Sequence, residues 1–221
     1  PVCTGAEDDR NPVSSKTPGF RPQVIPETRF SEKPGFEAVW TDIETLFDAL
    51  GGEFERNRIG PQRFLAPAAP PVAARREGRT VDARRLREGA DWWRGRVEML
   101  LVEGVGGLLC PLTETETVAG LAGDLGFPLL IVGRLGLGTI NHVLLTIEAA
   151  QRRRLPIAGI VLNQSTPEQP GPVAESNPAE IAARCRVPVL GTLPFMSPNL
   201  LQAGRPITMD WMELSRAVSR E

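Results

Sequence analysis

The sequence predicts a doubly wound α/β fold, in which helices cover both faces of a mostly parallel sheet. The first observation is that short apolar runs alternate with amphipathic segments through the second half of the chain. The second is that these runs are apolar at consecutive positions, which is typical of strands buried on both faces. The third is size, because 221 residues with 41% hydrophobic content are enough for one well-buried domain, which we take to span residues 1–221.

The first part of the chain predicts an arm followed by helices. Residues 5–40 are rich in proline, glycine and charged side chains, and we expect them to form a long mobile arm. Apolar residues then recur at helical spacing over 42–50. Beyond a proline- and alanine-rich segment over 61–74, Thr80 is expected to cap a helix that runs to about residue 94.

The remaining elements follow from the alternation of apolar runs and amphipathic segments. Strands are predicted over 99–102, 128–132, 157–162 and 187–190, and helices over 118–125, 140–151, 178–185 and 209–218. In parallel sheets of this kind, ligands bind outside the carboxyl ends of the strands. The residues that directly follow each strand are therefore the candidates for a functional site.

Composition excludes several classes of protein. No apolar run approaches the roughly 18–20 residues needed to cross a bilayer, and no secretion signal is recognisable, so we expect a cytoplasmic protein without a membrane partner. The 25 basic and 27 acidic residues are nearly balanced and form no basic stripe for nucleic acid. The three cysteines are widely spaced, which disfavours a zinc site, and the single histidine, His142, disfavours Ser-His-Asp catalysis.

The predicted strand over 99–102 delivers Glu103 into a glycine-rich turn over 103–107. A carboxylate suits Mg²⁺, and glycines allow backbone N–H groups to approach phosphate oxygens. A tight turn with a capping glutamate explains the same residues equally well.

The strand over 128–132 leads through a glycine-rich loop directly into a helix. Unpaired N–H groups at a helix start bind anions, and Thr139 or Asn141 would reinforce such a site. The loop contains no lysine and is therefore not a Walker A motif. A capped helix with flexible glycines is the alternative, and His142 is expected to pack or to cap.

Two further strand ends carry groups suited to a purine base. Asn163 follows the strand over 157–162, and its carboxamide offers both a donor and an acceptor. In the segment 193–196, the ring of Phe195 and the backbone would flank a base. The alternatives are a turn-forming asparagine and ordinary hydrophobic packing.

Five motifs of the second half stand in one order: Val102-Glu103-Gly104-x-Gly106-Gly107, Leu135-Gly136-x-Gly138-Thr139-Ile140-Asn141-His142, Gly159-Ile160-Val161-Leu162-Asn163, Asn177-Pro178-x-Glu180-Ile181 and Val187-Pro188-Val189-Leu190-Gly191-x-Leu193-Pro194. In order and spacing they resemble dethiobiotin synthetase, a family of P-loop NTPase-like ligases in biotin synthesis.

The resemblance implies ATP and Mg²⁺ as cofactors, 7,8-diaminopelargonate and CO₂ as substrates, and a homodimer. The substrate-binding residues would be Thr4, at the substrate carbamate, and Gly138, Thr139, Ile140 and Asn141, at the substrate carboxylate. The nucleotide-binding residues would be Glu103, Gly104, Val105, Gly106, Asn163, Gln164, Pro194, Phe195 and Met196. The metal ligands would be Asp42 and Glu103.

One part of the family pattern is missing from the sequence. The family's catalytic lysine would precede Pro1, the only lysines are Lys16 and Lys33, and Pro18 is incompatible with a phosphate-binding loop at Lys16. We therefore expect a chain that lacks the family's first strand, its phosphate-binding loop and the helix that the loop opens. Such a chain should be nearly inactive alone and should expose an apolar sheet edge.

Two alternatives to the ligase stay open. One is a degenerate, non-catalytic dimeric relative that binds a metabolite or a partner. The other is a different P-loop ATPase-type amide ligase, such as a cobyrinic acid amidation enzyme, which would need a glutamine amidotransferase domain that we do not recognise in the sequence.

Overall fold

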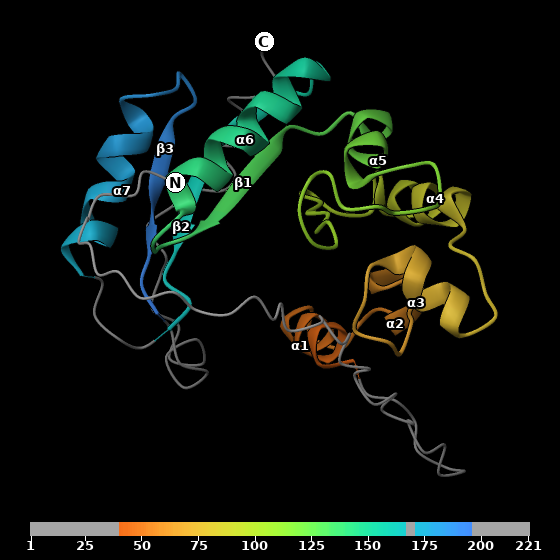
Figure 1. The fold of residues 1–221 in the computed structure, drawn as a ribbon. Coiled ribbons are helices and arrows are strands. Elements are labelled where there is room, and N and C mark those ends of the chain that lie inside the picture. Colours follow the sequence, from red (N-terminus) through yellow and green to blue (C-terminus); the bar gives the residue numbers. More distant parts are fainter. Residues whose placement is uncertain (1–39, 167–170, 196–221) are drawn as a thin grey trace, which may run out of the picture. The chain divides into compact units, whose positions relative to one another are not determined.

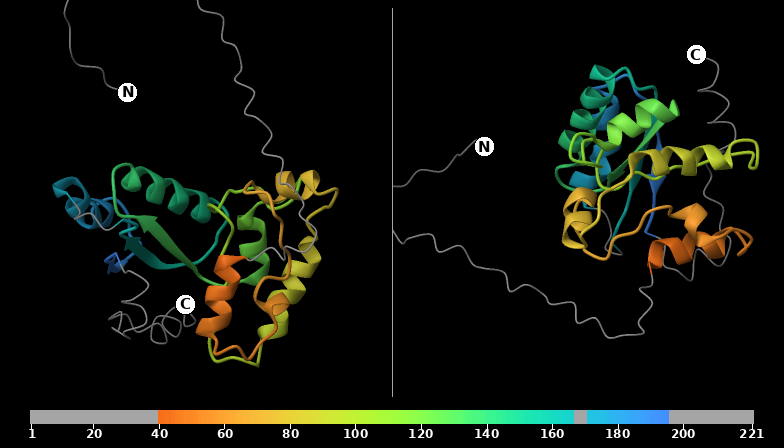
Figure 2. Two further views of the ribbon diagram at one scale, coloured as in Figure 1. Left: turned by 90° about the horizontal axis from the view of Figure 1, so that it is seen from below. Right: turned by 90° about the vertical axis from the view of Figure 1, so that its right-hand side faces the viewer.

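In the part of the chain that the structure describes, three parallel strands in the order β1-β2-β3 form a sheet (Figure 1). The computed structural model describes residues 40–166 and 171–195. The strands are β1 (Leu129–Arg134), β2 (Ile157–Asn163) and β3 (Val189–Leu193), and the crossover helices are α6 (Thr139–Arg152) and α7 (Pro172–Ala182). α6 runs alongside β1 and α7 alongside β3 (Figure 2). The predicted parallel α/β sheet is confirmed.

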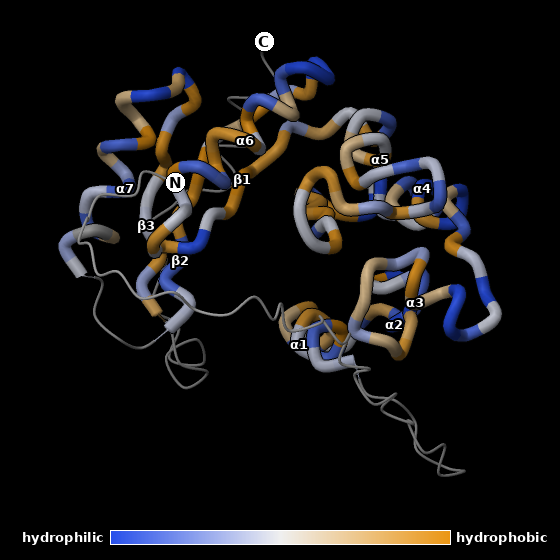
Figure 3. The backbone as a smooth tube through the Cα atoms, in the orientation of Figure 1, coloured by the Kyte–Doolittle hydropathy of each residue, from blue (hydrophilic) through white to orange (hydrophobic). Residues whose placement is uncertain are grey.

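The core lies between the sheet and the two crossover helices. Ile160 and Leu162 of β2 are fully buried against Val143 and Ile147 of α6, and Ile181 of α7 completes the cluster. Figure 3 shows apolar residues along β1 and on parts of α6. The central strand has the continuous apolar pattern that the sequence predicted.

At β1 only one face is buried. Ile131 packs into the core, whereas its neighbour Val132 is 61% exposed. β1 pairs on one side with β2, and no other strand pairs with it among the residues that the structure describes. Within the described ranges β1 is thus the edge strand next to β2, and the apolar side chain of Val132 is exposed on its outer face.

Between residue 40 and the sheet the chain forms five helices: α1 (Thr41–Ala49), α2 (Arg56–Ile59), α3 (Pro70–Arg76), α4 (Ala83–Trp93) and α5 (Val118–Leu125). α1 and α5 confirm the predicted helices. α3 was not predicted, and it begins with two prolines because its first positions need no N–H donor. None of the helices within the described ranges is long and apolar enough to cross a membrane.

Three details of the predicted elements are wrong. No strand forms over 99–102, where Leu101 is 75% exposed, because no neighbouring strand within the described parts offers hydrogen bonds to this run. The helix predicted over 178–185 begins earlier, at Pro172, a residue whose fixed φ suits the first helical position. The cap of α4 is also a different residue. The predicted arm, apart from Trp40, and the predicted helix over 209–218 lie outside the described residues.

Asp82, and not Thr80, caps α4: its carboxylate accepts a hydrogen bond of 3.0 Å from the backbone N–H of Arg85. Because an N-cap side chain satisfies an otherwise unpaired donor, Asp82→Ala is expected to lower the free energy of unfolding by about 1 kcal/mol. Urea denaturation measures this change. Thr80→Ala is the matched control, and an equal loss in both variants would contradict the assignment of the cap.

Candidate functional site

The carboxyl ends of the three strands meet at one edge of the sheet. Arg134 pairs with Asn163 in the β1–β2 ladder, and Asn163 pairs with Leu193 in the β2–β3 ladder. Beyond these pairs, the backbone N–H of Leu135 donates to the Asn163 carbonyl (2.8 Å), and that of Gln164 donates to the Leu193 carbonyl (2.9 Å). The segments after all three strands therefore start side by side, as expected for a ligand-binding edge of an α/β sheet.

Most of the residues predicted to flank a base lie at this edge. Asn163 and Gln164 are partly buried, and the Gln164 side chain donates to the Thr166 carbonyl (2.9 Å). After β3, Pro194 is exposed and Phe195 is partly buried. Two other predicted site residues, Thr4 and Met196, lie outside the described residues.

The start of α6 has the geometry of an anion site. Gly138 takes a left-handed conformation (φ 87°) that a residue with a side chain rarely adopts, and it turns the chain into the helix. The N–H of Thr139 donates to the Gly136 carbonyl (3.4 Å). The N–H groups of Ile140 and Asn141 have no acceptor within the described part of the chain. Two donors at a helix start thus remain for an anion.

A buried asparagine, Asn177, holds the loop in front of α6. Its side chain is 2% exposed and donates from Nδ2 to the Gly136 carbonyl (2.9 Å). The sequence showed Asn177 only as part of a motif at a predicted helix start. In the structure it lies inside α7, so that α7 and the loop over 135–138 are linked by this bond.

An open pocket of about 170 Å³ lies between β1 and the first turns of α6. It is lined by Ile131, Val132, Gly133, Arg134, Leu137, Thr139, His142, Val143 and Thr146. His142 is exposed on this surface, so the expectation that it packs is wrong. The pocket combines an apolar wall with cationic and hydroxyl groups, as a small carboxylic acid requires.

The loop over 103–107 is exposed and held by the start of α5. The N–H of Val118 donates to the Cys110 carbonyl (3.0 Å), and the N–H of Ala119 donates to the Leu108 carbonyl (2.9 Å). Gly104 lies so close that a Cβ there would be 2.8 Å from the Val118 side chain. Glu103 is exposed, and it forms no ion pair within the described part of the chain.

The predicted metal ligands are two exposed carboxylates. Asp42 lies in the first turn of α1, and Glu103 begins the glycine loop. Within the described ranges no group of three or more His, Cys, Asp or Glu side chains could hold a metal ion. Mg²⁺ commonly takes one or two carboxylates and completes its shell with water and phosphate oxygens. Each carboxylate thus suits Mg²⁺ delivered with a nucleotide, whereas neither fits a site built from protein ligands alone.

Comparisons with known proteins agree with this arrangement. A family model described as "AAA domain" matches residues 34–199. ATP-dependent dethiobiotin synthetase BioD of Anaeromyxobacter dehalogenans (strain 2CP-C) is 47% identical over 167 residues, which are 76% of this chain and 74% of that protein. The protein of the same name from Bacillus subtilis (strain 168) is 38% identical over 161 residues, 71% of this chain and 68% of that protein.

The residues that the family model matches include both the helical part and the sheet. A third relative of the same name, from Nitrosospira multiformis, is 35% identical over 157 residues, 71% of this chain and 69% of that protein. The predicted P-loop NTPase-like fold class agrees with the matching family model. The chain belongs to the dethiobiotin synthetase family.

Proposed function

We propose that this protein acts in biotin biosynthesis as a cyclo-ligase that makes dethiobiotin from 7,8-diaminopelargonate and CO₂ with ATP and Mg²⁺. The observation that carries the proposal is the meeting of three strand ends beside a helix start with free N–H donors. The names of the relatives support it. In this reaction one amine forms a carbamate with CO₂, ATP phosphorylates the carbamate, and the second amine displaces phosphate to close the ring.

In the proposed site the start of α6 binds the substrate carboxylate. The N–H groups of Ile140 and Asn141 donate to it, and Gly138 and Thr139 form the turn that presents them. The family resemblance assigns the carbamate to Thr4 and places the helix start across a two-fold interface. We therefore include a homodimer in the proposal.

The nucleotide part of the proposal uses the other strand ends. Asn163 and Gln164, with the segment 194–196, flank the adenine, and the loop over 103–106 lies along the phosphates. Glu103 and Asp42 bind Mg²⁺, which neutralises phosphate charge during phosphoryl transfer. No lysine of this chain matches the family's catalytic lysine, since its only lysines are Lys16 and Lys33. The described strand ends thus position ligands, and none of them carries a lysine.

The metal part of the site gives a direct prediction. Glu103→Gln keeps the size of the side chain and removes its charge, so Mn²⁺-dependent binding of ATP is expected to weaken by about tenfold, or about 1.4 kcal/mol. Isothermal titration with Mn²⁺ and ATP measures the change. Glu98→Gln, which alters another exposed carboxylate nearby, serves as the control. Equal affinities in the Glu103→Gln variant and the parent would remove Glu103 from the site.

The activity itself is tested by phosphate release from ATP with and without bicarbonate and diaminopelargonate. The assay is run on this chain and on a chain extended with the phosphate-binding strand and loop of a relative. Substrate-dependent release by the extended chain supports the ligase. If neither chain responds while metabolites still bind, the protein is a non-catalytic dimeric relative that binds a metabolite.

A further inference from the structure

We propose that Arg87 is a positioning residue, which holds the 103–107 loop in its ligand-binding place through Glu116 and the start of α5. The inference rests on the proposed function, because that function assigns the loop to Mg²⁺ and nucleotide phosphate. Neither the motifs of the sequence nor the predicted site residues include Arg87.

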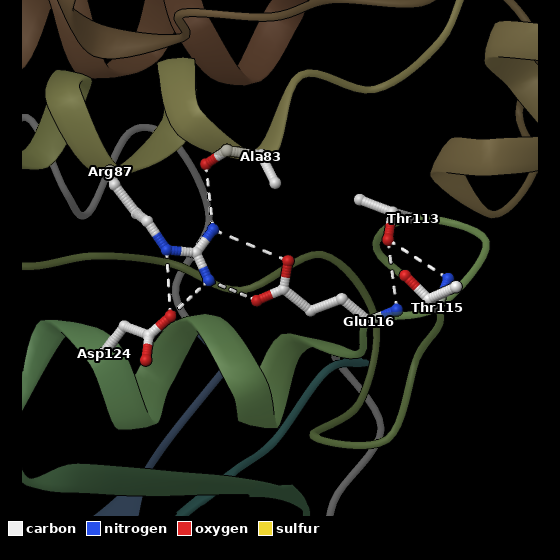
Figure 4. Close-up of polar contacts among 6 residues, drawn as sticks. All are labelled: Ala83, Arg87, Thr113, Thr115, Glu116 and Asp124. Atoms are coloured by element: carbon white, nitrogen blue, oxygen red, sulfur yellow. Dashed lines mark hydrogen bonds and ion pairs between the residues drawn. The ribbon is translucent and has the colours of Figure 1, made fainter.

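The guanidinium of Arg87, on α4, bridges two carboxylates that come from one stretch of chain (Figure 4). Its Nε donates to Asp124 Oδ2 (2.9 Å), and its Nη2 donates to both Asp124 and Glu116. Its Nη1 donates to the Ala83 carbonyl (2.9 Å). The Arg87 and Glu116 side chains are only 27% and 21% exposed, so this pair is screened less than a surface ion pair.

The two carboxylates occupy different parts of the α5 region. Glu116 lies in the turn that leads into α5, and Asp124 lies near the end of that helix. Arg87 therefore holds α5 at both ends against α4. The hydrogen bonds to the paired carboxylates, that to Glu116 first and that to Asp124 second, also raise the pKa of Arg87 above its ordinary value.

Glu116 is itself fixed in a closed turn. Its backbone N–H donates to Thr113 Oγ1 (3.0 Å), and its carbonyl accepts from the N–H groups of Leu112 (2.7 Å) and Thr113 (3.1 Å). The turn is closed by a bridge between Pro111 and Thr117. A displacement of the Glu116 side chain is therefore passed to the backbone on both sides of the turn.

The turn connects directly to the glycine loop. Thr117 precedes the two α5 residues, Val118 and Ala119, whose N–H groups bind the carbonyls of Cys110 and Leu108. Val118 is also the residue against which Gly104 packs. A continuous series of bonds and contacts thus runs from Arg87 to the residue next to Glu103.

The test compares four variants by amide hydrogen exchange and by Mn²⁺ titration of the full chain. Arg87→Met removes the guanidinium, and Arg87→Lys keeps the charge without the fork that reaches both carboxylates. Gly120→Ala leaves Arg87 intact but places a Cβ 2.9 Å from Glu116 Cγ, which forces the carboxylate away. Arg84→Met is the control, because Arg84 lies on the same helix and pairs only with exposed Glu88 among the described residues.

In Arg87→Met and Gly120→Ala, exchange at the Val118 and Ala119 amides is expected to rise about tenfold, while β2 amides such as Ile160 and Leu162 stay protected. The affinity of these two variants for Mn²⁺ is expected to fall. Arg87→Lys is expected to recover part of the amide protection and part of the Mn²⁺ affinity. Arg84→Met is expected to change neither the exchange rates nor the affinity. Unchanged exchange at Val118, or an equal rise in β2, overturns the proposal. If the Arg87→Met variant does not fold, the amide exchange and Mn²⁺ affinity of Gly120→Ala test the proposal by themselves.

Failure of the proposed function gives a different result. If the parent chain binds neither Mn²⁺ nor ATP, the metal and nucleotide assignment of the loop falls, whatever the exchange data show. If the parent binds Mn²⁺ and the Arg87→Met variant binds it equally well with a loosened loop, the function stands and the positioning role of Arg87 is wrong.

Discussion

Replacing Gly133 with valine is expected to lower the free energy of unfolding by about 2–3 kcal/mol, at the upper end of the roughly 1–3 kcal/mol that is typical of overpacked cores. Gly133 lies in β1 and faces α6. A Cβ at this position would stand 2.9 Å from Val143 Cγ2, 3.0 Å from Leu162 Cδ2 and 3.1 Å from Thr139 Oγ1. Because Val143 and Leu162 are buried, none of the three can retreat into solvent, and α6 must move away from the sheet.

The displacement would also reach the candidate site, since Thr139 is the first residue of α6. Urea denaturation measures the loss of stability, and titration with diaminopelargonate measures the effect on the helix start. For the stability measurement Gly107→Val is the matched control, because nothing lies within 4 Å of a Cβ built at Gly107. A similar small effect in both variants would show that α6 does not pack against Gly133 as described.

Replacing Asn177 with alanine is expected to lower the free energy of unfolding by about 2 kcal/mol, because the change removes a buried hydrogen bond and leaves the Gly136 carbonyl with only the longer bond from the Thr139 N–H. Asn177→Asp separates the loss of the hydrogen-bond donor from the loss of side-chain volume. It preserves the volume of the side chain but loses the Nδ2 donor that binds Gly136. Both variants should release the loop over 135–138 and weaken carboxylate binding at the start of α6.

Denaturation curves and diaminopelargonate titrations of the two variants measure these outcomes together. Gln151→Ala, at an exposed amide on α6, should change stability by less than about 0.5 kcal/mol. If Asn177→Asp binds the substrate as the parent does, the hydrogen bond to Gly136 stabilises the fold without positioning the site.

Local sequence signals predicted the regular elements with strong periodicity. The helices at α5 and α6 and the central strand β2 lie where apolar spacing indicated, because their patterns depend on neighbours within a few residues. The same reasoning failed over 99–102, where an apolar run has the composition of a strand. A strand needs a neighbouring strand to pair with its backbone N–H and C=O groups, and the residues of the run do not show whether such a neighbour exists.

The sequence by itself determined the family and the residues at the strand ends, since the motifs that carry both are contiguous and the strands that end in them are parallel. Only the tertiary structure decided which distant side chains hold those ends in place. Arg87 meets Glu116 across 29 residues and Asp124 across 37, and Asn177 meets Gly136 across 41. With 25 basic and 27 acidic residues, charge alone allows many ion pairs, and the packing of α4 on α5 selects those of Arg87. The packing of α7 beside α6 brings Asn177 to Gly136.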